Sequence, residues 1–319
     1  MKKYRTKDFN KVFGEKTNYI EDIIKEYLPE EEGKQKIIFE AINYSVLAGG
    51  KRIRPMLMME TYVLFGGKYL EWIKPFMAAI EFVHNYSLVH DDLPAMDNDE
   101  YRRGKKTTHV KYGETIGILT GDGLLNYAFE TAIKIYYNIP VGKANEIVEY
   151  KDRVVNALQT LAIKAGTKGM IGGQVIDTFV LEGMSVDGQE KKHLLQAINY
   201  MYDLKTGGLI QASMMIGAIL AGANKKDLLL VEKMASNIGI AFQIQDDILD
   251  VTSTKEKLGK PIKSDQRNEK LTYTSILGLE KAKEEVEFYS KNSLEIYNKI
   301  EKSNLFLYDL INKLINRDK

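Results

Sequence analysis

Six prolines leave the 319-residue chain in long stretches that nothing else interrupts, and this feature constrains the fold most. The prolines stand at positions 29, 55, 75, 94, 140 and 261, and each falls where a helical pattern begins or ends. A proline inside a helix removes a backbone hydrogen bond and clashes with the preceding turn. The confinement of proline to the ends of such patterns therefore favours long, unbroken helices.

Between the prolines, apolar residues recur at three- and four-residue spacing, as the buried face of a helix requires. Two such series are Ile37, Ile38, Ala41, Ile42 and Val46, and Leu229, Leu230, Met234, Ile238, Ala241 and Phe242. Sustained period-two alternation is nearly absent, and Gly207, Gly208 and Gly217 fall within helical patterns, where they allow close packing or a kink. We therefore expect one all-α domain over residues 1–319, with roughly ten or more helices.

The composition excludes several kinds of protein. A formal net charge of +1 provides no general surface for nucleic acid or anionic membranes, so any phosphate-binding charge must be local. Without cysteine the chain has no disulfide framework, thiolate nucleophile or cysteine-ligated zinc. The N-terminal residues lack the apolar core of a signal peptide, and the most apolar stretch, Met214 to Ala223, is too short to span a bilayer. We expect a soluble, cytoplasmic protein with no nucleic-acid partner and no stable membrane insertion.

The first acidic cluster follows a mostly apolar helical segment, FMAAIEFVHNYSLVH. It contains Asp91, Asp92, Asp97 and Asp99, and Pro94 is expected to end the helix there. Carboxylates at a helix C-terminus oppose the helix dipole, at a cost of about 0.3 to 1 kcal/mol per charge. A bound cation would offset that cost. The alternative is an acidic loop in solvent.

The second acidic cluster lies in IGIAFQIQDDILDV, an otherwise apolar helical segment. Asp246 and Asp247 stand four and three residues before Asp250, which places like charges on one face. Buried, unpaired carboxylates cost several kcal/mol or shift their pKa, and divalent cations would remove that penalty. Mg²⁺ fits better than Ca²⁺ or zinc because few carboxylates are offered, and Mg²⁺ completes its shell with water and substrate phosphates.

Basic residues accompany both clusters. GGKRIRP places Lys51, Arg52 and Arg54 on a glycine turn before a helix, where backbone donors and cations form an anion site. Arg102 and Arg103 follow the first cluster at once, either to neutralise it or to hold phosphate oxygens. Each motif has a plain alternative as a solvated surface charge.

These motifs in this order resemble the trans-prenyltransferases, the farnesyl and geranylgeranyl diphosphate synthase family. The resemblance runs from about Ser45 to Tyr273 and rests on GGKRIRP, DDLPAMD, RRGKKTTH, GMIGGQVID, KTGGLI, DDILD and LGKP. DDLPAMD is similar to the bacterial form of the first aspartate motif, and DDILD to the second. The resemblance implies an isoprenoid-synthase bundle of helices around a deep central cavity, a homodimer, three Mg²⁺ ions, and isopentenyl and allylic diphosphates as substrates.

The resemblance also assigns residues to sites, position by position. Those that match the isopentenyl diphosphate site are Lys51, Arg54, His84 and Arg103. The matched metal ligands are Asp91, Asp97 and Asp246. The matched contacts to the allylic diphosphate are Arg102, Lys205, Thr206, Gln243 and Lys260, with Lys270 as a helper. Catalytic roles fall to Asp91, Asp92, Asp97, Arg102, Lys205 and Asp246.

Several other positions carry an expectation. His84 lies seven residues, or two helical turns, before Asp91, so it shares nearly the same face; its alternative role is in the core. Gln174 and Asp177 belong to the GGQ motif near the cavity wall. Tyr202 replaces a histidine that relatives often have, without an expected contact to the chemistry, and Lys263 replaces a usual glycine in the loop after Lys260, which would change how that loop closes.

The expected reaction is ionisation of an allylic diphosphate followed by attack of isopentenyl diphosphate, with no protein nucleophile or histidine base. Tyr86, five residues before Asp91, and Ser87 are expected to line the tunnel for the growing chain, and the aromatic ring resembles the floor of bacterial farnesyl diphosphate synthases. Geranylgeranyl diphosphate is the alternative product. A class I terpene cyclase and a non-catalytic subunit of a heteromeric synthase are the alternative classes.

Overall fold

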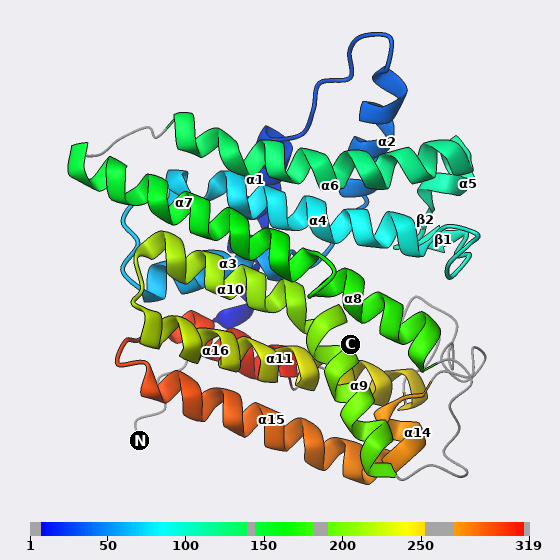
Figure 1. The fold of residues 1–319 in the computed structure, drawn as a ribbon, viewed down its shortest axis with the longest axis vertical. Helices are drawn as coiled ribbons and strands as arrows, with labels where there is room; N and C mark the ends of the chain where they lie inside the picture. Colours follow the sequence, from blue (N-terminus) through cyan, green and yellow to red (C-terminus); the bar gives the residue numbers. More distant parts are fainter. Residues whose placement is uncertain (1–7, 139–143, 182–190, 253–270, 316–319) are drawn as a thin grey trace. The chain divides into compact units, whose positions relative to one another are not determined.

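The computed structural model describes residues 8–138, 144–181, 191–252 and 271–315, and helices make up most of them (Figure 1). The backbone groups into two compact units. Unit 1 comprises Met1–Phe9, Glu60–Gly66 and Gln159–Lys319, and unit 2 comprises Asn10–Met59 and Gly67–Leu158. The expected all-α class with roughly ten or more helices is confirmed. The single domain over residues 1–319 and the central cavity stay predictions.

Unit 2 is built on α4, Lys74–Asp91, most of whose side chains are buried. Pro75 stands in its first turn, where a missing N–H costs nothing. The helix ends at Asp91, three residues before Pro94, as predicted. It packs against α6, Glu114–Tyr137, and α2, Lys36–Val46. The other helical elements with residues in this unit are α1 (Phe9–Glu26), α3 (Ile53–Leu64), η1 (Leu70–Trp72), α5 (Thr108–Tyr112) and α7 (Ala144–Ala165).

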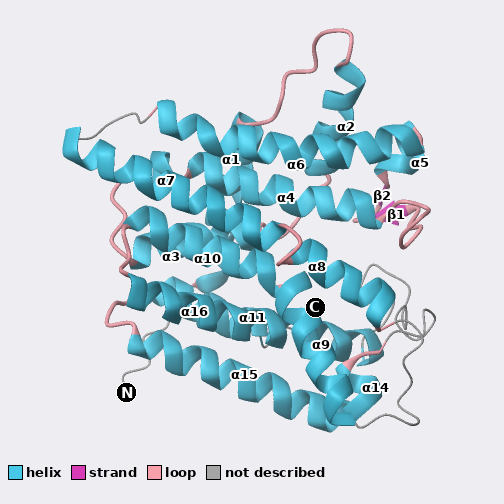
Figure 2. Cartoon of the chain, viewed as in Figure 1, coloured by secondary structure: helices cyan, strands magenta, loops and turns pink. Residues whose placement is uncertain are grey.

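A short β-hairpin is the one departure from helices and loops in the described residues (Figure 2). Its strands are β1, Tyr101–Arg102, and β2, Lys105–Lys106, paired antiparallel. Arg103 and Gly104 form the two-residue turn with φ of 53° and 75°. Positive φ at both central residues is what the twist of such a hairpin demands. Strands of two residues are too short to show the alternation by which a sequence reveals a strand.

Unit 1 contains the second aspartate motif on its longest helix, α11, Lys225–Thr252. This helix packs against α15, Leu279–Lys299, and α10, Gly207–Ala221, whose side chains are buried almost throughout. The other helical elements of this unit are α8 (Met170–Val175), the π-helix η2 (Ile176–Val180), α9 (Lys191–Lys205), α14 (Tyr273–Leu277) and α16 (Leu305–Ile315).

Glycine permits the close approach of helices in unit 1, as the sequence predicted. A Cβ at Gly239 of α11 would lie 2.5 Å from the Cα of Gly207, which begins α10. A Cβ at Gly173 of α8 would overlap the backbone of Lys205. These contacts bring the Lys205–Thr206 junction, where the chain bends by 46° between α9 and α10, against both neighbouring helices.

Two further expectations concern the backbone. The four prolines among the described residues lie at helix ends: Pro29 follows α1, Pro55 and Pro75 stand in first turns, and Pro94 follows α4. Within the described ranges no single helix is long and apolar enough to cross a membrane; α9 and α10 reach that length and composition only as a bent pair.

Candidate active site

The first aspartate motif occupies the end of α4 and the loop after it. The backbone N–H of Asp97 donates to the carbonyl of Asp91 at 2.9 Å, so the loop folds back onto the end of the helix. Asp97 is exposed and Asp91 is half-buried. The turn therefore brings together two residues with oxygen ligands, the kind that a hard cation prefers.

Asp92 has a different environment from its neighbours in the motif. Its side chain is buried, and its Oδ1 accepts from Arg102 Nε at 2.7 Å and lies 2.6 Å from Arg102 Nη2. Asp99 Oδ2 lies 3.3 Å from the same nitrogen. Burial alone would lower the pKa of Arg102, but the bond to Asp92 and the surrounding carboxylates raise it. Asp92 thus fixes a charged guanidinium beside the cluster.

The hairpin places Arg103 beside the glycine turn of GGKRIRP. A Cβ at Gly50 would lie 3.1 Å from both terminal nitrogens of Arg103, so the guanidinium rests against the Gly50 backbone. Arg103 adopts a left-handed φ of 53°, which costs a bulky residue about 1 to 3 kcal/mol. Such strain is typical of residues whose position serves a site.

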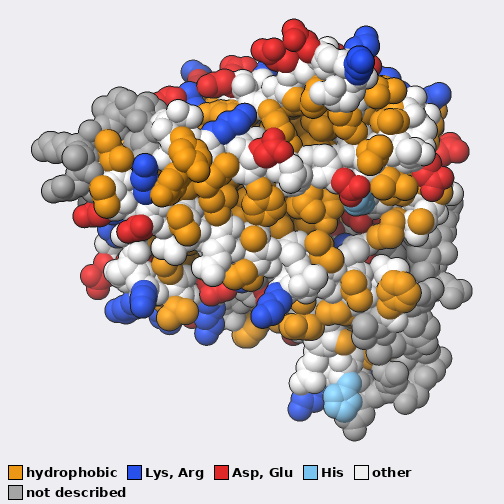
Figure 3. Space-filling model, turned by 45° about the horizontal axis from the view of Figure 1, so that its top comes forward, with side chains coloured by type: hydrophobic (Ala, Val, Ile, Leu, Met, Phe, Trp, Pro, Cys, Tyr) orange, Lys and Arg blue, Asp and Glu red, His pale blue; other side chains and the backbone are white. Residues whose placement is uncertain are grey.

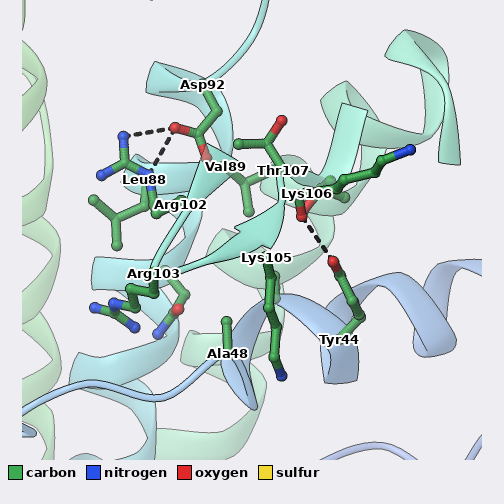
Figure 4. A pocket seen from close by; sticks show the side chains of 13 residues that line it. Tyr44, Ala48, Leu88, Val89, Asp92, Arg102, Arg103, Lys105, Lys106 and Thr107 are labelled. Atoms are coloured by element: carbon green, nitrogen blue, oxygen red, sulfur yellow. Dashed lines mark hydrogen bonds and ion pairs between the residues drawn. The ribbon is translucent and has the colours of Figure 1, made fainter. Parts of the chain in front are cut away.

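The hairpin, α2 and α4 line a pocket that is partly open to solvent (Figure 4). Figure 4 shows the guanidinium groups of Arg102 and Arg103 on the same side of the pocket, while Lys106 points the opposite way. Tyr44 Oη donates to the carbonyl of Lys106 at 2.7 Å and so attaches the hairpin to α2. Two neighbouring guanidinium groups on one wall suit a ligand with several negative oxygens.

Burial and the positive charges of neighbouring arginines both affect the pKa of His84. Burial, and then the charges of Arg54 and Arg103, hold the pKa of His84 well below its ordinary value. The imidazole is therefore neutral at neutral pH and offers a hydrogen bond rather than a charge. Of the residues matched to isopentenyl diphosphate, His84, Arg54 and Arg103 thus lie near one another, all within unit 2.

The sequence did not reveal the part played by Arg52. Its side chain is buried, with Nη1 donating to Glu81 Oε1 and Nε to Glu21 Oε1, each at 2.7 Å. Nη2 also donates to the Val46 carbonyl at 2.8 Å. Arg52 thus holds the basic turn against α1 and α4, and its guanidinium is not available to a ligand. The signal for this contact was Glu81, a lone carboxylate within the apolar segment that precedes the first motif.

The three aspartates of DDILD, in unit 1, also differ in burial, as those of the first motif do. Asp246 and Asp250 are half-buried, whereas Asp247 is only 2% exposed. Asp247 Oδ2 accepts from Tyr202 Oη at 2.6 Å and from the backbone N–H of Tyr273 at 3.0 Å. The expectation that all three carboxylates share one face is therefore corrected: Asp247 turns inward because α9 and α14 supply its donors.

Residues matched to the allylic diphosphate gather at the junction of α9 and α10. Lys205 Nζ forms an ion pair with Asp177 Oδ2 of η2 at 2.5 Å. Thr206 Oγ1 donates to Gln243 Oε1 of α11 at 2.8 Å, one turn before Asp246. Gln174 lies on α8, which ends one residue before η2 begins. Lys260, Lys263 and Lys270 lie outside the described residues.

The described residues fit a metal that other ligands help to hold. No three His, Asp or Glu side chains in those ranges converge on a point where they could bind a metal ion by themselves. Each motif nevertheless offers two partly accessible carboxylates, Asp91 with Asp97 and Asp246 with Asp250. Mg²⁺ is commonly held by one or two carboxylates, with water and substrate phosphates completing its shell.

Tyr86 lies one and a half turns before Asp91 and is 8% exposed. Its ring meets that of His90 edge to face, with centroids 5.4 Å apart, and His90 Nε2 lies 3.0 Å from the Ile118 carbonyl of α6. A Cβ at Gly121 would overlap the His90 ring. Burial, and then the charge of Asp91, raise the pKa of Tyr86, so its hydroxyl stays neutral. Ser87 Oγ donates to the carbonyl of His84 at 2.9 Å.

Comparisons with known proteins agree with these motifs. The family model described as polyprenyl synthetase matches residues 35–306. A geranylgeranyl diphosphate synthase of Cyanophora paradoxa is 39% identical over 304 residues, 95% of each chain. A farnesyl diphosphate synthase of Geobacillus stearothermophilus is 40% identical over 276 residues, 86% of each chain. A Helicobacter pylori geranyltransferase structure, complexed with magnesium and isoprenyl diphosphate, is 27% identical with a TM-score of 0.77 and covers 98% of each chain.

Proposed function

Because the chain belongs to the polyprenyl synthetase family and is a prenyltransferase, we propose that it condenses isopentenyl diphosphate with allylic diphosphates in a Mg²⁺-dependent reaction. The observation that carries this proposal is the first motif. Asp97 folds back onto Asp91, and Asp92 holds the Arg102 guanidinium beside them. Carboxylates for a metal and a guanidinium for phosphate oxygens are what ionisation of a diphosphate needs.

In the proposed reaction the allylic C–O bond breaks, the alkene of isopentenyl diphosphate forms the new C–C bond, and a proton leaves. Bound Mg²⁺, for which the structure complexed with magnesium gives support, would neutralise the leaving pyrophosphate. The proposed metal ligands are Asp91 and Asp97 in unit 2, and Asp246 in unit 1. Arg102 and Lys205 would bind oxygens of the allylic diphosphate, and Lys51, Arg54, His84 and Arg103 would position isopentenyl diphosphate. In this scheme Asp177 releases Lys205 when the allylic substrate binds.

An assay of pyrophosphate release, with and without isopentenyl diphosphate, tests the class of reaction. A prenyl diphosphate synthase releases pyrophosphate from geranyl diphosphate only when isopentenyl diphosphate is present and gives a longer diphosphate. A terpene cyclase would release it from the allylic substrate alone. A non-catalytic subunit would release none, although the chain keeps the acidic residues that such a subunit would have lost.

We propose farnesyl diphosphate as the main product, with geranylgeranyl diphosphate as the second candidate, since similar proteins carry both names. The buried ring of Tyr86, one and a half turns before the metal-binding carboxylates, supports a short chain.

The wild type is expected to make mainly a fifteen-carbon product, and Tyr86→Ala to shift it toward twenty carbons or more. The substitution opens apolar volume, and each buried CH₂ of the chain adds about 0.8 kcal/mol. Chromatography of the dephosphorylated products measures the shift. Tyr86→Phe keeps the ring and serves as the control with an unchanged product. A wild type that makes mainly twenty carbons, or an unchanged product from Tyr86→Ala, contradicts the assignment.

The two hairpin arginines are expected to serve different substrates. Arg103→Ala should raise the KM for isopentenyl diphosphate and Arg102→Ala that for the allylic diphosphate, each by about ten- to a hundredfold, because a hydrogen bond to a charged group contributes about 1.5 to 3 kcal/mol. Their different surroundings support the division, since Arg102 bonds Asp92 and Arg103 rests on Gly50. Steady-state kinetics with each substrate varied in turn is the measurement. Equal effects on both constants would rule the division out.

We also propose a homodimer. Ile118 and Leu119 of α6 are 42% and 48% exposed. Exposed apolar side chains that form a contiguous patch are typical of protein interfaces. Figure 3 turns forward the face on which α6 lies in Figure 1, and apolar side chains gather there. A second copy of the chain would cover this face.

A further inference from the structure

The buried carboxylate of Asp247 joins three helices of unit 1. Tyr202 of α9 donates its hydroxyl to Asp247 Oδ2 at 2.6 Å, and the first N–H of α14, that of Tyr273, donates to the same oxygen at 3.0 Å. A carboxylate that is 2% exposed needs such donors, because a buried charge without them costs several kcal/mol. The orientation of Asp247 is therefore set by residues outside its own helix.

A second bond joins the junction after α9 to α11, one turn away. Thr206 stands four residues after Tyr202, and its hydroxyl donates to Gln243, four residues before Asp247, at 2.8 Å. Residues four apart lie on one face of a helix, so the two bonds form successive rungs between antiparallel segments. Lys205 directly precedes Thr206, which makes one of the two bonds, and Asp246 directly precedes Asp247, which makes the other. The rungs thus fix the backbone on which both of these residues stand.

Tyr202 is itself held in place. Its ring stacks on that of Tyr273, with centroids 6.0 Å apart and an interplanar angle of 28°. Tyr273 donates its hydroxyl to Asn199 of α9, which also accepts from Tyr289 of α15 at 3.3 Å. Burial, and then the neighbouring Tyr289, raise the pKa of Tyr273, so it remains a donor. The Tyr202 hydroxyl is thereby aimed at Asp247 before any ligand binds.

We propose that Tyr202 is a positioning residue of the second aspartate motif, which acts by holding Asp247 so that Asp246 and Lys205 keep the orientation that a metal diphosphate requires. This inference rests on the proposed function. It gives a role to a tyrosine whose contact with Asp247 the sequence did not predict. A histidine could donate one hydrogen bond to the same carboxylate, and a residue without a donor could not.

Tyr202→Phe tests the proposal because it keeps the ring that stacks on Tyr273 and removes only the donor. We expect the half-saturating Mg²⁺ concentration and the KM for the allylic diphosphate to rise about tenfold each, as they do when a metal ligand loses its supporting partner. The KM for isopentenyl diphosphate should stay unchanged. Tyr202→His, which restores a donor, should recover most of both losses.

Tyr150→Phe is the matched control. Tyr150 is equally buried, and its hydroxyl donates to the Trp72 carbonyl at 2.6 Å in unit 2. The variant loses a buried hydrogen bond of the same length, so its melting temperature should fall while its Mg²⁺ dependence stays that of the wild type. An equal change of Mg²⁺ dependence in Tyr150→Phe would show a general loss of stability and overturn the proposal.

Hydrogen exchange in the metal-free protein provides a readout that does not depend on turnover. Tyr202→Phe should speed exchange at the start of α14, where the Tyr273 N–H bonds Asp247, and Tyr150→Phe should not. Unchanged exchange together with unchanged Mg²⁺ dependence in Tyr202→Phe overturns the inference. If Tyr202→Phe does not fold, failure of Tyr202→His to behave like the wild type overturns it instead. A wild type without transferase activity defeats the proposed function, whereas the exchange experiment still tests the contact.

Discussion

Replacement of Asp91 or Asp246 with alanine is expected to lower kcat on the order of a thousandfold or more and to leave the protein folded. Each carboxylate is proposed to hold Mg²⁺ on the leaving diphosphate, and the loss of several kcal/mol of charge stabilisation in the transition state has an effect of this size. Stability should not suffer. Asp91 is the last residue of α4, where a negative charge opposes the helix dipole by about 0.3 to 1 kcal/mol.

The measurement is pyrophosphate release over a range of Mg²⁺ concentrations, with thermal unfolding of each variant beside it. Asp22→Ala is the control, because its side chain is 76% exposed on α1 and pairs only with the exposed Lys25 in the contacts described. It removes the same charge without touching either motif. Near-normal turnover with unchanged Mg²⁺ dependence in Asp91→Ala would refute the assignment of the metal ligands.

Helices were predictable from this sequence because proline position and apolar spacing are local signals. Pro75 and Pro94 bracket α4, and all but one of the apolar residues between them are buried. The hairpin could not be predicted in this way, because strands of two residues show no periodicity in the sequence. The one indication of the hairpin in the sequence was Gly104. Both turn residues, Arg103 and Gly104, adopt positive φ, and of the two only a glycine indicates this in a sequence.

Within the candidate site, the identity of the motifs was predictable but the division of work among adjacent residues was not. Three cations follow the glycines of GGKRIRP, and their charge and spacing alone do not distinguish them, yet Arg52 turns into the core. Asp247 turns inward within DDILD because Tyr202 and Tyr273 supply donors. These partners lie 45 and 26 residues away in the chain, so spacing within the motif cannot reveal them.

Arg52 gives the second large expected effect, on stability instead of catalysis. Arg52→Ala should lower the free energy of unfolding by about 3 to 5 kcal/mol, because it leaves the carboxylate of Glu81, only 2% exposed, without its guanidinium partner. For a chain of this size that loss corresponds to a fall in melting temperature of roughly 5 to 7 °C. Burial alone would lower the pKa of Arg52, but Glu81 and Glu21 raise it, so the charge persists in the core.

The cost arises from an uncompensated charge, and this cause can be separated from lost packing. The double variant Arg52→Met with Glu81→Met fills the space with apolar groups and removes both charges, so it should recover much of the loss, as buried ion pairs replaced by apolar side chains commonly do. Lys283→Ala is the control: its pair with Glu280 at 2.8 Å is exposed, and its removal should cost less than about 1 kcal/mol. Chemical unfolding of the four proteins measures these differences. If the double variant is as unstable as Arg52→Ala, lost volume and not the stranded carboxylate of Glu81 explains the effect, and the basic turn is held by packing.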